Sequence, residues 1–282
     1  RASALSIQSP MLYFQSMDMI VRCALTEPMW QRLKRQEGAL LGIVASILFF
    51  MGVISHELFF KTGLALLTLS TLYFFNDLTD CIADQNNPRK DQPYITTLVE
   101  NRKFYWACLV LQKSIALGLA FYSSLELALV VLTVFFINST YSLKLKGIPY
   151  IDVIWVGLWG AGITAMAGLQ QPPESFVLVG IMTAISHIYQ VRLDAEVDTA
   201  HNVQTSAVWS HRTTEAQIVV LCMGLAAILS QTHLPWLALT VFTPWILGKY
   251  LKSNRAWVLA RYYFGIIWLC YLESVYGRLA QF

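Results

Sequence analysis

Acidic residues gather in two short segments that lie far apart in this chain of 282 residues, and these segments hold seven of its seventeen carboxylates. The seven residues are Asp77, Asp80, Asp84, Asp91, Asp194, Glu196 and Asp198. Oxygen ligands of this kind, with no His or Cys partner at a suitable spacing, favour a hard cation such as Mg²⁺. The pattern predicts a magnesium site if the fold brings the two segments together.

Helical spacing places the polar groups of each segment on one face. Residues advance by about 100° along a helix, so positions i and i+4 lie on the same side. The first stripe contains Asn76, Asp77, Asp80 and Asp84, and the second contains Asp194 and Asp198, continued deeper by His187 and Gln190. Carboxylates at this spacing repel one another, so a cation is expected between them. A solvated helix end explains one stripe alone, but not two stripes of similar spacing.

The elements that position these carboxylates must be membrane helices. Soluble domains carry roughly 25% charged residues, whereas this chain has 13% charged and 56% hydrophobic residues and a mean hydropathy of +0.52. A spanning helix needs roughly 20 apolar residues, and a shorter run can be completed by packing. Nine runs are predicted to span: Ala39–Leu58, Gly63–Asp84, Phe104–Tyr122, Leu125–Tyr141, Ile151–Leu169, Ser175–Asp194, Glu215–Ser230, Leu234–Gly248 and Ala256–Tyr276.

Basic residues fall in alternate loops between these runs, which predicts the orientation of the chain. Lysine and arginine are retained on the cytoplasmic side of a membrane. They precede the first run and lie between the second and third, fourth and fifth, sixth and seventh, and eighth and ninth runs. The opposite side holds Lys61 and the terminal Arg278. The N-terminus and both acidic segments are therefore predicted to be cytoplasmic.

Several other classes of protein are disfavoured. The five cysteines are scattered without a CxxC pair, so neither a disulfide framework nor a zinc site is indicated. The net charge of +3 comes from basic loops between apolar runs, which is not a nucleic-acid-binding pattern. Residues 1–17 are interpreted as a tag remnant or disordered N-terminus, and residues 18–282 as a single all-α membrane domain.

Three motifs together carry a resemblance to a known family. The matching residues are Asn76, Asp77, Asp80 and Asp84 in the pattern N-D-x-x-D-x-x-x-D, Asn87-Pro88-Arg89-Lys90 after it, Asp194 and Asp198 in the pattern D-x-x-x-D, and Tyr141-Ser142 with Lys144 and Lys146. At these residues the chain resembles the UbiA superfamily of intramembrane prenyltransferases. The resemblance covers the second to sixth runs well and the last three by hydropathy alone.

The resemblance implies nine transmembrane helices around a central cavity, two Mg²⁺ ions, and an isoprenyl diphosphate substrate whose prenyl group passes to an aromatic or other lipid-compatible acceptor. It implies metal ligation by Asn76, Asp77, Asp80, Asp84, Asp194 and Asp198. The carboxylates of Asp80, Asp84, Asp194 and Asp198, with the rings of Tyr73 and Tyr141 facing an allylic cation, are the expected catalytic groups. Diphosphate is expected to contact Lys144, Lys146, Arg89, Lys90 and Asn138.

Departures from the family pattern leave the product open. Gln92-Pro93 stands where many members have Arg-Pro, and Val197 and Thr199 stand near the position of a usual glycine. A UbiA-type terpene cyclase, in which the double bonds of the substrate attack its own cation, is therefore the alternative function. A cation or solute transporter with acidic vestibules is a third hypothesis, disfavoured because the helix midplanes offer few ionisable relays.

Overall fold

The protein is described by a computed structural model, which describes residues 22, 26–34, 39–53, 55–85, 87, 90–200, 203–232, 234–251 and 253–277. All regular secondary structure in these ranges is helical. The elements are α2 (Glu27–Lys34), α3 (Ala39–Phe50), α4 (His56–Asp84), α5 (Gln92–Glu100), α6 (Arg102–Ser123), α7 (Leu125–Thr140), the π-helical turn η1 (Tyr141–Leu145), α8 (Ile151–Ala165), α9 (Pro173–Ala200), α10 (Ser206–Trp209), α11 (His211–Leu229), α12 (Leu237–Thr240), α13 (Thr243–Gly248) and α14 (Ser253–Tyr276).

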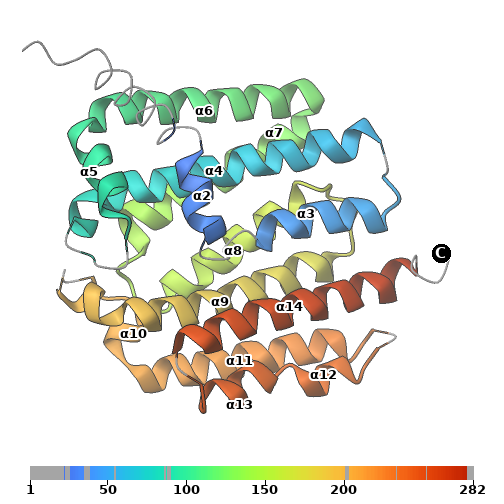
Figure 1. The fold of residues 1–282 in the computed structure, drawn as a ribbon. Helices are drawn as coiled ribbons and strands as arrows, with labels where there is room; N and C mark the ends of the chain where they lie inside the picture. Colours follow the sequence, from blue (N-terminus) through green and yellow to red (C-terminus); the bar gives the residue numbers. More distant parts are fainter. Residues whose placement is uncertain are drawn as a thin grey trace, which may run out of the picture.

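The long helices form a closed ring. Going round the ring, α3 packs on α4, α4 on α6 and α7, α7 on α8, α8 on α9, and α9 on α11 and α14, while α14 returns to contact α3. The short helices α5 and α10 lie at the same end of the bundle, α5 near the C-terminal end of α4 and α10 near that of α9 (Figure 1). Consequently, the two acidic segments emerge at the same end of the ring.

Six helices in the described residues are long and apolar enough to cross a membrane: α4, α6, α7 with η1, α9, α11 and α14. The three remaining predicted spans coincide with the shorter apolar segments Ala39–Phe50, Ile151–Ala165 and Leu237–Gly248. Their lengths are compatible with helices that are completed by packing against longer neighbours. The prediction of an all-α, multi-pass membrane protein is confirmed, and the number of nine spans stays a prediction.

Two predicted spans are wrong at their C-terminal boundaries because of local backbone geometry. The first ends at Phe50 rather than Leu58, since Gly52 adopts a φ of 80° and the next helix starts at His56 with Ser55 as its N-cap. The run ending at Leu169 stops at Ala165, before Gly168 with a φ of 140°. Left-handed backbone of this kind ends a helix and favours glycine.

The eighth predicted span also differs, because it is divided into α12 and α13. Pro244 lies in the first turn of α13, where a missing backbone N–H is tolerated. Helices α2 and α5 lie outside the nine predicted runs. Both are short, and both end up beside the acidic segment of α4 (Figure 1).

Small residues bring α8 and α9 together. A Cβ placed on Gly157 would lie 3.2 Å from the carbonyl oxygen of Gly180, and one placed on Gly160 would lie 2.7 Å from Cβ of Thr183. Such close backbone approach is available only where side chains are absent. It holds α9, which carries the second acidic segment, in a fixed position relative to α8 and the turn η1 that precedes it.

Candidate active site

One cavity of about 870 Å³ opens inside the ring and contains residues from both acidic segments. Its polar lining includes Asn76, Asp80, Asp84, Asn87, Lys90, Ser142, Lys144, Lys146, Asp194 and Asp198. Its other walls are apolar and aromatic, with contributions from Val156, Trp159, Met182, Phe264 and Trp268. The cavity thus combines a charged end with a hydrophobic interior.

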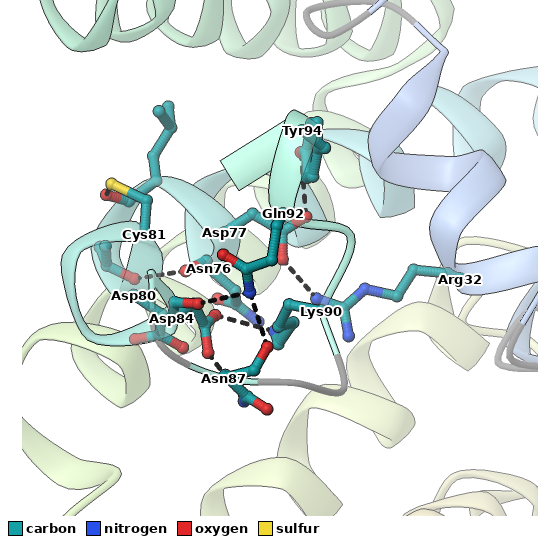
Figure 2. Close-up of polar contacts among 12 residues, drawn as sticks. Arg32, Asn76, Asp77, Asp80, Cys81, Asp84, Asn87, Lys90, Gln92 and Tyr94 are labelled. Atoms are coloured by element: carbon teal, nitrogen blue, oxygen red, sulfur yellow. Dashed lines mark hydrogen bonds and ion pairs between the residues drawn. The ribbon is translucent and has the colours of Figure 1, made fainter. Parts of the chain in front are cut away.

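Each inward carboxylate at the end of α4 has a lysine partner. Lys146 Nζ lies 2.6 Å from Asp80 Oδ2, and Lys90 Nζ lies 2.9 Å from Asp84 Oδ2. Asn87 donates a hydrogen bond to Asp84 Oδ1 at 3.2 Å (Figure 2). Asn76 faces the same cavity and accepts a hydrogen bond from Ser142 Oγ. These two carboxylates are therefore held in place by lysine side chains at the cavity wall.

Asp77 points elsewhere. Arg32 Nη2 lies 2.7 Å from Asp77 Oδ1, and the Tyr94 hydroxyl donates to Asp77 Oδ2 at 3.1 Å (Figure 2). Asp77 is buried and does not line the cavity. It is one residue beyond Asn76, so the helix turns its side chain about 100° away from that of Asn76. The structure therefore groups Asn76, Asp80 and Asp84 at the cavity and separates Asp77 from them.

Hydrogen bonds with residues of α2 and α5 hold the segment between α4 and α5 in place. Asp91 accepts from the backbone N–H of Tyr94 as the N-cap of α5 and from Gln31 of α2 at 2.9 Å. Gln92 Nε2 donates to the backbone carbonyls of Asp84 and Asn87 at 3.2 and 2.6 Å. Asp91 and Gln92 thus fix the backbone next to the site through hydrogen bonds. Lys90, in the same segment, is held beside Asp84.

The second acidic segment extends helix α9 beyond the predicted membrane span. Asp194 and Asp198 both lie in α9, one turn apart, and both line the cavity. Burial, the Asp194 carboxylate and the Asp80 carboxylate together raise the pKa of Asp198 to about 6, while Lys146 and a hydrogen bond from Thr205 act in the opposite direction. The carboxylates of Asp80 and Asp198 interact electrostatically, and both line the cavity. The two acidic segments therefore lie at the same cavity mouth.

Lys146 joins the two acidic segments electrostatically. Burial by itself lowers the pKa of Lys146, but the Asp80 carboxylate, together with Tyr141 and Asp198, outweighs that effect and raises the pKa above its usual value. Lys146 follows the π-turn η1, in which its backbone N–H bonds to the carbonyl oxygen of Tyr141 at 2.9 Å. The wide turn therefore places the ammonium of Lys146 at the cavity mouth, beside Asp80.

The donor set suits a hard divalent cation. The ligating atoms available at the mouth are carboxylate and amide oxygens. Burial is the main cause of the raised pKa of Asp198, and the neighbouring carboxylates Asp194 and Asp80 raise it further, so a cation would relieve part of the effect. In the part of the chain that is described, no three Asp, Glu, His or Cys side chains converge on one point. Mg²⁺ suits such an arrangement, since it keeps several waters and uses a few carboxylates together with substrate phosphates.

The remaining predicted site residues divide into two groups. Tyr73, Tyr141 and Lys144 line the cavity. Asn138 does not, because it is buried and donates to the backbone carbonyl of Leu72 at 3.4 Å. This contact makes Asn138 a helix-packing residue between α7 and α4 in the structure. Arg89 lies outside the described residues.

Two cavity residues were missed by sequence reasoning. Arg32, interpreted as one of the basic residues ahead of the first span, is buried and lines the cavity, with its guanidinium 4.9 Å from the centroid of the Tyr73 ring. Asn87, quoted only as part of a family-like stretch, contacts Asp84 directly. The sequence signal for Asn87 was its position just after the first acidic segment. Arg32 precedes the first predicted span, where the positive-inside rule explains a basic residue equally well.

The other membrane-embedded cations have local partners. Lys113 lies 4.3 Å from the centroid of Phe75 and donates to Ser139 at 3.3 Å. Arg192 forms an ion pair with Glu215 at 2.9 Å. Arg261 lines the cavity and stacks on Trp257 at 3.7 Å. Neither Lys113 nor Arg192 lines the cavity. The lysines that line the cavity, among the described residues, are Lys90, Lys144 and Lys146.

The ring of helices and its acidic cavity mouth define an all-helical membrane protein built around one central chamber. A sequence profile described as the UbiA prenyltransferase family matches residues 39–261, most of the chain, and the chain therefore belongs to that family. No curated protein sequence matches it significantly.

Solved structures show the same fold at low sequence identity. A UbiA homologue from Archaeoglobus fulgidus bound to DMAPP and Mg²⁺ is 15% identical, with a TM-score of 0.63 over 87% of this chain and 98% of that chain. The same homologue bound to GPP and Mg²⁺ gives a TM-score of 0.62 at 15% identity over the same shares. A structure described as digeranylgeranylglyceryl phosphate synthase is 12% identical, with a TM-score of 0.62 over 93% of this chain and 99% of that chain.

Proposed function

We propose that this protein is a Mg²⁺-dependent intramembrane prenyltransferase that ionises an isoprenyl diphosphate and transfers the prenyl group to an aromatic or other lipid-compatible acceptor. The observation that carries the proposal is the placement of Asp80, Asp84, Asp194 and Asp198 around one cavity mouth, above an apolar interior. Family membership supports the reaction type, and the DMAPP-bound and GPP-bound homologue structures support an isoprenyl diphosphate as substrate.

The residues at the mouth suit a diphosphate head group. The carboxylates of Asp80, Asp84, Asp194 and Asp198, with Asn76, would hold Mg²⁺, two ions being expected. When bound, Mg²⁺ neutralises the charge that develops on diphosphate as the carbon–oxygen bond breaks. Lys90 and Lys146 are already fixed by Asp84 and Asp80, so their ammonium groups are positioned to donate hydrogen bonds to phosphate oxygens.

The interior of the cavity suits the prenyl chain and the cation formed from it. Leu40, Ile43, Met182 and Phe264 present apolar surface, while Tyr73 and Trp159 meet edge to face with ring centroids 5.7 Å apart. Aromatic faces stabilise a nearby cation, and a dry wall keeps water from capturing it. Burial of a long isoprenoid tail is favoured by about 0.8 kcal/mol for each CH₂ group.

Incubation of purified protein in detergent with Mg²⁺ and geranylgeranyl diphosphate tests the proposal. Diphosphate release and product masses are measured with and without a phenolic acceptor, for wild type, Asp80→Ala and Asp194→Asn. We expect wild type to release diphosphate and each variant to lose at least about 100-fold in rate. Glu57→Gln, which removes an exposed carboxylate at the opposite end of α4, is the matched control and should retain the rate.

The products separate the alternatives. A prenylated phenol supports the transferase, whereas a hydrocarbon formed without acceptor supports the UbiA-type cyclase. Activity in detergent excludes transport as the main function, because detergent abolishes any gradient. Absence of diphosphate release from wild type under all conditions, or near-normal turnover by Asp80→Ala, would overturn the proposal.

A further inference from the structure

The proposed reaction requires a base that acts after ionisation. When the C1–O bond of the prenyl diphosphate breaks, both electrons leave with diphosphate. The π electrons of the acceptor ring form the new carbon–carbon bond, and the attacked ring carbon must then lose its proton. The carboxylates at the mouth are assigned to metal ligation, so another group of the cavity wall has to accept this proton.

His187 lies in the right region of the cavity. It is on α9, seven residues before Asp194, so the two side chains share nearly one helical face and His187 is about 10 Å deeper. It lines the cavity and is 8% exposed. The reacting carbon of a bound prenyl diphosphate has to lie on the interior side of the mouth carboxylates, which is the side on which His187 is found.

Tyr141 completes a hydrogen-bonded pair with His187. The Tyr141 hydroxyl oxygen and His187 Nε2 are 3.4 Å apart, and the rings meet edge to face with centroids 5.9 Å apart. Tyr141 begins the π-turn η1 and also lines the cavity. π-Helical turns are often found at functional sites, because they reorient a side chain within an otherwise regular helix.

Two charged side chains act on this pair from neighbouring elements. Burial disfavours the charged form of His187; among the described residues, Asp152 on α8 opposes this effect and Lys146, after η1, adds to it. Asp152 is fully buried and accepts hydrogen bonds from the backbone N–H groups of Ser206 at 3.0 Å and Val153 at 2.9 Å. An imidazolium at His187 is attracted by Asp152, while the opposing ammonium of Lys146 is paired with Asp80.

We propose that Tyr141 and His187 form the proton-accepting pair of the reaction, an inference that rests on the proposed function. As the carbon–hydrogen bond breaks, the Tyr141 oxygen takes the proton and passes its own proton to His187 Nε2. After the product has left and water has entered the cavity, the imidazolium releases its proton to that water. The net reaction converts prenyl diphosphate and an acceptor C–H group into prenylated acceptor, diphosphate and one proton.

The test compares products as well as rates, since the pair acts after ionisation. Full-length protein is incubated with Mg²⁺ and geranylgeranyl diphosphate, with and without 4-hydroxybenzoate as the phenolic probe. The readouts are diphosphate release and the ratio of carbon–carbon-bonded product to geranylgeraniol, the alcohol formed by water capture. His187→Gln and Tyr141→Phe should keep diphosphate release within about threefold of wild type and lower the ratio at least about tenfold.

Two controls distinguish a base from a merely structural residue. His56→Gln makes the same change at an exposed histidine at the opposite end of α4, outside the cavity, and should leave the product ratio unchanged. Added imidazole should restore the ratio in His187→Ala without altering diphosphate release, because a small base then occupies the vacated space. A packing defect at this position would not be repaired by imidazole.

Other outcomes overturn the inference. Parallel loss of diphosphate release and product in both variants would assign the pair to ionisation or folding, and an unchanged ratio would show that neither residue handles the proton. Wild type that releases diphosphate but yields only geranylgeraniol would mean that no proton leaves carbon. Wild type that releases no diphosphate identifies a failure of the proposed function itself.

Discussion

Neighbouring carboxylates at the end of α4 have different partners, and this difference was not accessible from spacing alone. Asp80 faces the cavity and Lys146, whereas Asp77 faces Arg32 and Tyr94. A helical wheel places both on one broad stripe, but it cannot say where the stripe ends. The edge is set by α2 and α5, which lie outside the predicted spans. Sequence reasoning therefore predicted the cavity-facing members of the first motif and did not foresee the separate environment of Asp77.

Removal of Asp77 should lower stability more than it affects the reaction. The Arg32–Asp77 ion pair is buried, with side-chain exposures of 9% and 5%, and loss of one partner from a buried pair costs about 3–5 kcal/mol. Asp77→Ala should therefore lower the thermal unfolding temperature in detergent, while the Mg²⁺ concentration for half-maximal activity stays near wild type. The combination Arg32→Met with Asp77→Leu should recover most of the stability. A large increase in the Mg²⁺ requirement of Asp77→Ala would instead make Asp77 a metal ligand.

Lys146 is expected to contribute to binding of the diphosphate. Its ammonium lies 2.6 Å from Asp80 and also interacts electrostatically with Asp198. A charge-assisted hydrogen bond from this ammonium to a phosphate oxygen would contribute about 1.5–3 kcal/mol. Lys146→Met should raise KM for geranylgeranyl diphosphate at least about tenfold. Lys61→Met, at the opposite end of α4, is the matched control. Equal effects of the two substitutions would contradict a role at the mouth.

At the scale of elements, the long apolar helices were predictable and their ends were less so. Hydropathy located every long helix, because a run of apolar residues has no alternative to burial in protein or lipid. It placed the end of the first span too late, since Val53 and Leu58 continue the apolar run after Gly52 has already turned the chain. The short helices α2 and α5 are amphipathic, and their packing against α4 decides their position.

The contact between α8 and α9 should be sensitive to one added methyl group. A Cβ at position 160 would lie 2.7 Å from Cβ of Thr183, and overpacking of this kind costs about 1–3 kcal/mol. Gly160→Ala should lower the unfolding temperature and reduce turnover, because α9 carries Asp194 and Asp198. Gly118→Ala has open space around it and should be neutral or stabilising. Similar unfolding temperatures for the two variants would contradict close helix packing as the cause.

At the scale of the whole molecule, the site exists only because helices from opposite parts of the ring meet at one end. Asp80 lies on α4 and Asp198 on α9, and their charges interact across the cavity. Aspartates four residues apart occur in both acidic segments, and this repeated spacing predicted that the segments act together. The distribution of lysine and arginine predicted that both lie on the same membrane face. The Tyr141–His187 contact was beyond that reasoning, because it depends on the local geometry of η1 and the approach of α8 to α9.

A ligand that bridges the two segments should stabilise the whole ring. We expect Mg²⁺ with inorganic pyrophosphate to raise the unfolding temperature more than either component alone, because a ligand that binds only the folded state stabilises it by mass action. Asp194→Asn should abolish most of this joint effect while leaving the unliganded unfolding temperature close to wild type. Additive shifts from the two components, unchanged in the variant, would argue against a shared site.

The cavity mouth is expected to face the cytoplasm. Lys90, Lys144 and Lys146 gather there, as the positive-inside rule requires. In a cysteine-free background, a cysteine at Gly147 should react with a membrane-impermeant maleimide in inside-out vesicles, and one at Gln170 should react in right-side-out vesicles. The reverse pattern would show that diphosphate must enter from the other side.

The π-turn η1 also sets the direction in which the side chains after it point around the helix axis. Its hydrogen bond from Lys146 N–H to Tyr141 spans five residues rather than four, so the turn holds one residue more than a regular α-helical turn. If the same residues formed a regular α-helix instead, Lys146 would be rotated by about 100° around the helix axis and would no longer point toward Asp80. The five-residue turn thus decides whether this ammonium meets Asp80 or is directed along the bundle wall.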